Sequence, residues 1–250
     1  MSQKVLIEVV IDSVRSAIAA QEGGANRVEL CDNLVEGGTT PSAGMIQQVR
    51  TSINIGLQVM IRPRGGDFCY APEELAVMKQ DIQMVKALGA DGVVFGLLTE
   101  AAHIDVANMQ ELIDLARPMN VTCHRAFDMT VDPEKALQEL IELGVDQLLT
   151  SGTQTTAVEG KTQIAQWVQA VGDKIEIMPG SGITAENVQE ILETGVQSIH
   201  TSGRGSIDSK MQFRNPHISM GGGRLPAEYE LLVADTQKIA AVRKKVDEGR

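Results

Sequence analysis

The run Gly144-Val145-Asp146-Gln147-Leu148 decides the fold, because its pattern recurs three more times along the chain. In each copy a helical run ends at Gly, a short polar link follows, and an apolar run begins almost at once. Glycine suits the left-handed position just past a helix end, and a short link then feeds the next strand. The other three copies begin at Gly24, Gly89 and Gly195. These runs predict four helix-to-strand turns.

The periodicity of apolar residues between these turns predicts eight strands that alternate with helices. Pro72 and Pro133 stand where a helix accepts proline in its first turn, which supports the alternation. Alternation favours parallel pairing, and eight units favour closure into a (β/α)₈ barrel over an open doubly wound sheet. An open doubly wound sheet would favour a GxGxxG motif after the first strand, and the sequence has no such motif there. The predicted strands are 4–10, 26–31, 56–62, 92–98, 121–127, 147–151, 175–179 and 198–202.

One domain is expected over residues 1–250, because barrels of this type commonly need about 250 residues. The glycine-rich run Met220-Gly221-Gly222-Gly223 predicts an extra C-terminal loop that is mobile or lies over the barrel mouth. A last helix is predicted over residues 226–248, after that loop.

Net charge and cysteine usage narrow the partners and the compartment. The formal net charge of −11 repels nucleic acid and anionic lipid, because binding to either relies on Lys and Arg. No run approaches the roughly 20 apolar residues of a membrane span, and the N-terminal stretch lacks the pattern of a signal peptide. Three cysteines without a CxxC spacing favour reduced thiols. We therefore expect a cytoplasmic protein with no nucleic-acid and no membrane partner.

Strand parity predicts an unusually polar barrel interior. Side chains alternate along a strand, so the β-branched set faces the helices and the other set fills the barrel. A structural barrel interior consists mainly of Val, Ile and Leu, whereas buried polar groups cost stability unless they pair or serve a ligand. An internal ion-pair network is one interpretation, and a functional site is the favoured one. On strand 2, Arg27 also has inner parity. The inner polar set is Glu8, Glu29, Arg62, His124, Ser151, Glu176, His200 and Ser202.

Four of these side chains form the predicted catalytic centre. Glu8 and Glu29 lie on adjacent strands, so their repulsion would raise one pKa and create an acid–base pair. Arg62 is predicted to clamp an anion, or else to neutralise Glu29. His124 is predicted to carry a proton or to join the glutamates around a divalent metal ion, with a hydrogen-bonded core group as the alternative.

Further polar residues lie at the rim of the predicted barrel. Arg125 and Asp128 follow His124 and complete the catalytic candidates, with a surface ion pair as the alternative. Small-residue loops follow strands 6, 7 and 8, where barrels often bind phosphate, although tight turns also use such residues. The anion-binding candidates are Ser151, Gly152, Gly180, Ser181, Gly182, Ser202, Gly203 and Arg204.

Four segments of the chain together resemble the CutC family of copper-homeostasis proteins. The resemblance implies a (β/α)₈ barrel, a cytoplasmic location, a homo-oligomer (dimer or tetramer) and a link to copper. It brings no established reaction. The segments are Ile61-Arg62-Pro63-Arg64-Gly65-Gly66-Asp67-Phe68, His124-Arg125-Ala126-Phe127-Asp128, Arg27-Val28-Glu29-Leu30-Cys31 and Leu149-Thr150-Ser151-Gly152.

Copper binding would rest on thiols, because soft ligands select Cu(I). Cys31 faces inward at the end of strand 2, and Cys69 lies in the loop after the neighbouring strand 3, so we expect them to approach one another. An incidental pair of reduced thiols is the alternative. Cys123 has outward parity and is expected to be a buried core residue.

Three hypotheses follow for the function. The first is a cytoplasmic copper-homeostasis protein that binds Cu(I) at Cys31 and Cys69. The second is a lyase, isomerase or hydrolase whose Glu8, Glu29, Arg62 and His124 act on a small phosphorylated or carboxylated metabolite. The third is a small-molecule sensor or an assembly subunit. The expected partner is accordingly a copper ion or a small-molecule anion, and the question of catalysis is left open.

Overall fold

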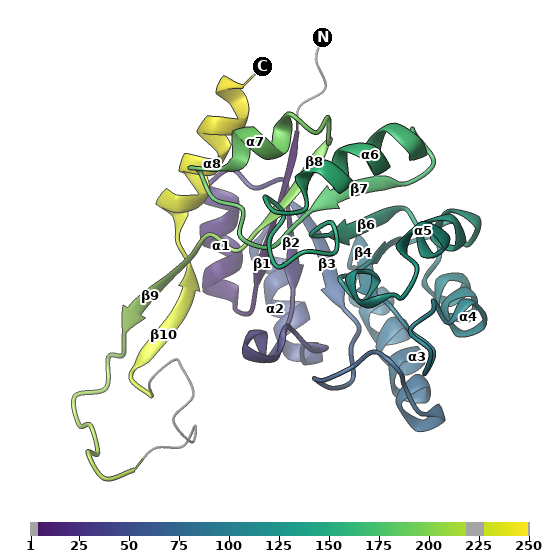
Figure 1. The fold of residues 1–250 in the computed structure, drawn as a ribbon. Coiled ribbons are helices and arrows are strands. Elements are labelled where there is room, and N and C mark those ends of the chain that lie inside the picture. The colour runs from purple at the N-terminus through teal and green to yellow at the C-terminus, as the bar shows by residue number, and fades with distance from the viewer. Residues whose placement is uncertain (1–4, 219–227, 250) are drawn as a thin grey trace.

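The computed structural model describes residues 5–218 and 228–249, and it confirms the predicted barrel. Eight parallel strands form one sheet in the order β7-β6-β5-β4-β3-β2-β1-β8, and β8 comes back beside β7 (Figure 1). The strands are β1 (Leu6–Ile11), β2 (Arg27–Leu30), β3 (Gly56–Met60), β4 (Gly92–Phe95), β5 (Asn120–Cys123), β6 (Gln147–Thr150), β7 (Glu176–Pro179) and β8 (Ser198–Thr201).

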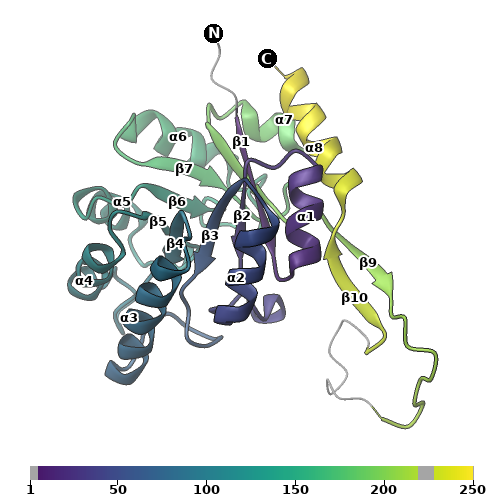
Figure 2. The same ribbon diagram turned by 180° about the vertical axis from the view of Figure 1, so that it is seen from behind.

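Helices cover the outside of this sheet, as both views show (Figures 1 and 2). The longer ones follow successive strands, and two 3₁₀ turns lie in the loops at the strand ends. The helices are α1 (Val14–Glu22), α2 (Ala43–Ser52), α3 (Pro72–Ala87), α4 (Val106–Ala116), α5 (Pro133–Glu142), α6 (Lys161–Val171), α7 (Val188–Leu192) and α8 (Thr236–Glu248), with 3₁₀ turns η1 (Leu34–Glu36) and η2 (Phe127–Met129). No helix among the described residues is long and apolar enough to cross a membrane.

The four glycine turns that predicted the fold have the left-handed backbone conformation expected just past a helix end. Gly24, Gly89, Gly144 and Gly195 have φ values of 87°, 76°, 72° and 88°, a region that side chains disfavour. Each turn leads directly into a strand of the barrel. Helix starts are also set by nearby residues. At the start of α5, for example, the Asp132 side chain accepts a hydrogen bond from Lys135 N.

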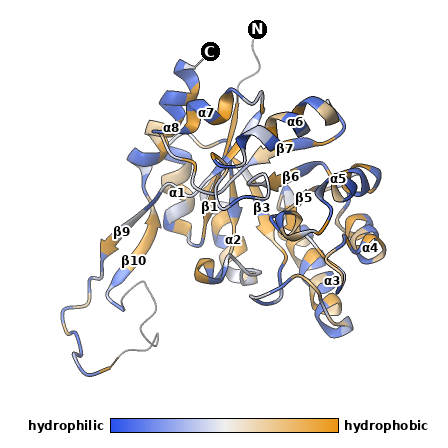
Figure 3. Cartoon of the chain, in the orientation of Figure 1, coloured by the Kyte–Doolittle hydropathy of each residue, from blue (hydrophilic) through white to orange (hydrophobic). Residues whose placement is uncertain are grey.

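The apolar core lies between the sheet and the helices, where strand parity predicted it. Ile7 and Val9 of β1 and Val28 and Leu30 of β2 are fully buried in this layer. Hydrophobic residues accordingly concentrate on the strands, and hydrophilic ones on the loops and outer helix faces (Figure 3). The alternate residues point into the barrel, where polar groups such as Glu8 and Arg27 lie beside a small apolar cluster that contains Met60 and Val94.

The C-terminal region differs from the prediction in its secondary structure. The helix predicted over 226–248 begins only at Thr236, because Glu230–Ala234 forms strand β10. This strand pairs antiparallel with β9 (Arg204–Asp208), and the Asp235 side chain then caps α8. The backbone of the apolar run Leu231-Leu232-Val233 forms its hydrogen bonds in this pairing. The two strands project from the barrel as a ribbon (Figure 1). The predicted loop at 220–223 lies outside the described residues.

Candidate functional site

Three ionisable side chains meet inside the barrel at the centre of the site. The ladder between β1 and β8 places Glu8 beside His200, and Glu29 projects from the next strand, β2. His200 Nε2 lies 2.8 Å from Glu29 Oε2 and 3.9 Å from Glu8 Oε1. One potential ligand atom from each residue lies within 4.8 Å of the others. Parity therefore placed both glutamates correctly, and the structure adds His200 to them.

Arg27 supports this cluster from the adjacent layer of the barrel interior. Its Nε donates to Glu8 Oε2, and its Nη2 donates to Gln147 Oε1 and lies 3.4 Å from Met178 Sδ. The ladder sets this contact, because Glu8 stands opposite Arg27 in the register of β1 and β2. Strand parity placed the side chains of Arg27 and His200 inside the barrel, but neither residue was among the predicted site residues. Both residues stand opposite Glu8 on the neighbouring strands β2 and β8, and this alignment is the signal that would have indicated them.

Burial and charge set the protonation of the cluster. Burial raises the pKa of Glu8, and the charges of Arg27 and His200 only partly oppose that rise. Burial by itself would lower the pKa of His200, but the charge and hydrogen bond of Glu29 raise it overall. Glu8 Oε1 and Glu29 Oε1 are buried and have no hydrogen-bond partner. Two carboxylate oxygens and an imidazole nitrogen are ligands that divalent metal ions accept.

His124 lies buried at the end of β5 as a neutral imidazole. Its Nδ1 accepts a hydrogen bond of 3.2 Å from Ala126 N, while its Nε2 has no partner. Burial, helped by the charge of Arg62, lowers its pKa from the ordinary 6.5 to about 4. The ring packs on Phe68 with centroids 4.9 Å apart. A side chain in this state donates one hydrogen bond at neutral pH and carries no charge.

Arg62 holds the loops at the mouth of the barrel. Its Nη1 donates to the carbonyl oxygens of Glu36 and Gly38, and its Nη2 donates to that of Gly66, each at 2.8 Å. The guanidinium lies over the Phe68 ring at 5.0 Å from the centroid. Its Nε is buried and has no partner. The Nη atoms of Arg62 therefore bind backbone, and the side chain also interacts with the Tyr70 hydroxyl.

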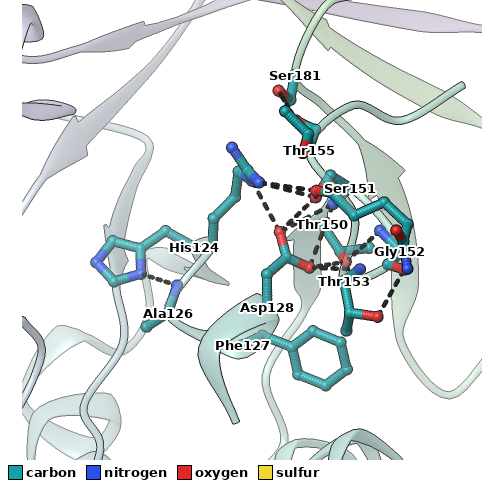
Figure 4. Close-up of polar contacts among 12 residues, drawn as sticks. His124, Ala126, Phe127, Asp128, Thr150, Ser151, Gly152, Thr153, Thr155 and Ser181 are labelled. Atoms are coloured by element: carbon teal, nitrogen blue, oxygen red, sulfur yellow. Dashed lines mark hydrogen bonds and ion pairs between the residues drawn. The ribbon is translucent and has the colours of Figure 1, made fainter. Parts of the chain in front are cut away.

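Arg125 and Asp128 belong to a separate network at the rim. Asp128 accepts hydrogen bonds from Thr150 Oγ1 at 2.5 Å, from Ser151 N at 3.0 Å and from Thr153 N at 3.2 Å. Arg125 Nε donates to Asp128 at 2.8 Å. Figure 4 shows Asp128 turned towards Thr150 and Ser151, while the His124 ring points away from it. The pair thus joins the loops after β5 and β6.

Comparison with known proteins assigns the family. Residues 5–205 match the sequence model of the CutC family. The chain belongs to the CutC family. The mouse and human relatives named copper homeostasis protein cutC homolog are 51% and 49% identical, each over 94% of this chain and 86% of the relative. A Bacteroides fragilis relative named family protein CutC is 47% identical over 94% of both chains.

Solved structures agree with this CutC assignment. The CutC structure from Streptococcus agalactiae is 36% identical, superposes with a TM-score of 0.76, and covers 79% of this chain and 98% of its own. Thiamine phosphate pyrophosphorylase from Pyrococcus furiosus has a TM-score of 0.63 at 18% identity, which shows the shared fold alone. The predicted family and barrel are thereby confirmed.

The thiols of this CutC-family chain lie in different surroundings. Cys31 is buried against Met60 and Val94, and burial together with the charge of Glu29 raises its pKa well above the usual value. Cys69 is half-buried in the loop after β3, and its amide donates to Asp67 at 3.1 Å. Cys123 is a buried core residue, with its pKa raised to about 12 by burial. The Glu8–Glu29–His200 cluster includes none of the three.

The small-residue loops of the CutC barrel lie at the strand ends, as the sequence predicted. Ser181 and Gly182 have φ values of 80° and 75°, and Ser181 Oγ donates to the Thr155 carbonyl at 2.8 Å. Gly180 N donates to the Thr150 carbonyl at 2.9 Å, which ties the loop after β7 to β6. Gly152 N likewise donates to Thr150 Oγ1. These groups hold the turns together.

A hollow beside the loop after β8 is lined by three of the anion-binding candidates. Ser202, Gly203 and Arg204 line a cavity of about 400 Å³ together with Lys238 of α8. The Lys238 ammonium donates to the Arg204 carbonyl at 2.8 Å. Glu176, which shares the inner parity, lies instead at the start of β7 and lines a different hollow. The polar interior is therefore not one continuous site.

Proposed function

We propose that this CutC-family chain binds a divalent metal ion with Glu8, Glu29 and His200, and contributes to copper homeostasis through that binding. The observation that carries the proposal is the cluster itself: three ligand atoms lie within 4.8 Å of one another, and two buried carboxylate oxygens lack partners. The relatives named for copper homeostasis supply the biological context. Structural ion pairs alone would not require unpartnered oxygens.

The chemistry of the donors favours Cu²⁺ among the divalent ions. Nitrogen and oxygen sites follow an order of affinity that peaks at Cu²⁺, ahead of Zn²⁺ and Mn²⁺. A bound ion would replace the proton that His200 otherwise shares with Glu29, so binding should weaken as the pH falls. Arg27 would keep its hydrogen bond to Glu8 and orient that carboxylate from behind, as partners of metal ligands commonly do.

Cu(I) at Cys31 and Cys69 is the second candidate, because thiols prefer that ion. The observation in its favour is that Cys31 lies within electrostatic reach of Glu29 and Glu8, so a cation near the cluster would also stabilise its thiolate. Free thiols also support the expected cytoplasmic location. The homo-oligomer implied by the family stays a prediction, which light scattering on the purified chain would test.

Metal titration of the purified, metal-stripped protein separates these candidates. Cu²⁺, Zn²⁺ and Mn²⁺ are titrated by calorimetry, and Cu⁺ is titrated anaerobically against a competing chelator. We expect Glu29→Gln to weaken Cu²⁺ by at least about 100-fold, because a lost ligand should cost more than a lost outer partner. Glu176→Gln is the matched control, since this carboxylate lies at the start of β7.

The thiol variants complete the design. Cys31→Ala with Cys69→Ala should leave the Cu²⁺ affinity within about twofold, because the cluster contains neither residue. Equal Cu²⁺ binding by the wild type and the Glu29→Gln variant would refute the carboxylate site. A loss of Cu⁺ binding confined to the cysteine variant would instead support the second candidate.

A further inference from the structure

Two buried hydrogen-bond donors in the barrel mouth have no partner. His124 Nε2 and Arg62 Nε are both solvent-inaccessible, and both side chains belong to residues only 4% exposed. The tautomer of His124 follows from its geometry: Nδ1 accepts from Ala126 N, so the proton is on Nε2. Both free atoms are therefore N–H donors. An unpaired buried donor costs free energy, and such groups in native proteins call for an explanation.

These donors lie near the unpartnered acceptors inside the barrel, since the charges of Arg62, Glu29 and Glu8 all act on Cys31. The charges of Arg62 and Glu29 both act on His124, which places all three side chains in one electrostatic environment. Glu8 Oε1 and Glu29 Oε1 lack partners as well. Two unpartnered donors thus follow β3 and β5, and two unpartnered acceptors come from β1 and β2; the buried Tyr70 hydroxyl also lies near Arg62. A cation satisfies the acceptors, but the donors require an oxygen atom that accepts hydrogen bonds.

We infer that His124 and Arg62 form a subsite for one ligand oxygen beside the metal position, and that the ligand is a small carboxylic acid that chelates the ion. One oxygen of the acid would bind the ion held by Glu8, Glu29 and His200. A second oxygen, from a carboxylate or an adjacent carbonyl, would accept hydrogen bonds from His124 Nε2 and Arg62 Nε. This inference rests on the proposed function, because without a cation the two glutamates repel an anion.

The donors are well suited to such an oxygen. A neutral imidazole donates without adding charge, and the guanidinium supplies the positive charge that favours a carboxylate. Together with a metal ion they would polarise a carbonyl group, which is the arrangement that enzymes use to stabilise a developing oxyanion. The ligand class thereby narrows from any phosphorylated or carboxylated metabolite to an acid with two oxygens in chelating positions.

Phe68 covers the proposed subsite. Its ring packs on His124 at 4.9 Å and on Arg62 at 5.0 Å, and the residue is half-buried. Its carbonyl accepts a hydrogen bond from Leu98 N at 2.8 Å, which holds the backbone at this residue. In this position the ring would obstruct an acid that approaches the two donors. Phe68→Ala should therefore speed the association of the acid more than it changes the affinity for the metal.

The test uses Cu²⁺ as the metal and oxalate as the acid, on the full chain. Calorimetry measures Cu²⁺ binding first and then oxalate binding to the Cu²⁺-loaded, desalted protein, while electron paramagnetic resonance follows the copper. We expect His124→Ala to leave the Cu²⁺ affinity and spectrum unchanged and to weaken oxalate by about tenfold, as expected for one lost hydrogen bond. His103→Ala, a substitution in the turn after β4, is the matched control and should change neither.

The outcomes distinguish the two proposals. If the protein binds Cu²⁺ but His124→Ala binds oxalate as tightly as the wild type, the oxygen subsite is wrong and the metal site stands. If oxalate does not perturb the copper spectrum of the wild type, chelation at this site is likewise refuted. If Cu²⁺ itself does not bind at the cluster, the proposed function fails and the inference fails with it.

Discussion

Replacement of Arg27 by Met should destabilise the protein strongly, although the mutation deletes no apolar contact. The Glu8 side chain is completely buried, and its one strong partner is Arg27, whose side chain is 10% exposed. Removal of one partner of a buried pair leaves an uncompensated charge and costs about 3–5 kcal/mol. Arg27 also donates to Gln147, so that amide oxygen loses a hydrogen bond too. We expect a loss in this range in the free energy of unfolding.

Chemical and thermal denaturation measure this loss. For a chain of this size about 1 kcal/mol lowers the melting temperature by roughly 2–4 °C, so a decrease of about 10 °C is expected. The double variant Arg27→Met with Glu8→Gln should recover most of the stability, because residue 8 then carries no charge that lacks a partner. Arg214→Met is the control, since Arg214 pairs with the exposed Asp208 and should cost less than about 1 kcal/mol.

The dependence on pH gives an independent check on the same variant. Without Arg27 the pKa of Glu8 rises further, so the folded protein takes up a proton at this carboxyl more readily than the unfolded chain does. The difference in free energy of unfolding between the wild type and the Arg27→Met variant should therefore become smaller as the pH falls. A loss below about 1 kcal/mol at neutral pH, or a double variant no more stable than the single one, would refute this reasoning.

Three further predictions concern other parts of the molecule. His124 stays neutral down to about pH 4 when folded but takes up a proton near 6.5 when unfolded, so stability should fall by about 3 kcal/mol across that window; His124→Gln should flatten the profile measured by urea denaturation. Asp128→Ala should cost about 2–3 kcal/mol and speed amide exchange at Ser151 and Thr153. Asp235→Ala removes the cap of α8 and should cost about 1 kcal/mol by the same denaturation assay.

The barrel could be predicted from the sequence because its signals are local. Each glycine turn and each helix start needs only a few neighbouring residues, and strand parity then fixes which side chains point inward. For this reason Glu8, Glu29 and His124 were placed correctly. Strand β10 was missed because its partner β9 lies more than twenty residues away in sequence, and the pairing cannot be inferred from the run Leu231-Leu232-Val233 alone.

The composition of the site was harder to predict than its location. Parity assigns a side chain to the interior but does not give the level at which it lies or its partners there. The ladder decides that Glu8 stands beside Arg27 and His200, and Arg62 binds backbone carbonyls that no sequence pattern indicates. Asp128 also required the structure, because its partners come from the loop after another strand.

The register around Glu8 has a consequence for how the barrel closes during folding. A slip of β1 by one residue would turn Glu8 towards the helix layer and send Ile7 into the polar interior. Such a misaligned ladder would leave the buried Arg27 guanidinium without the carboxylate of Glu8, at a cost of several kcal/mol. The Glu8–Arg27 pair thus selects the correct alignment of the first strand against the second.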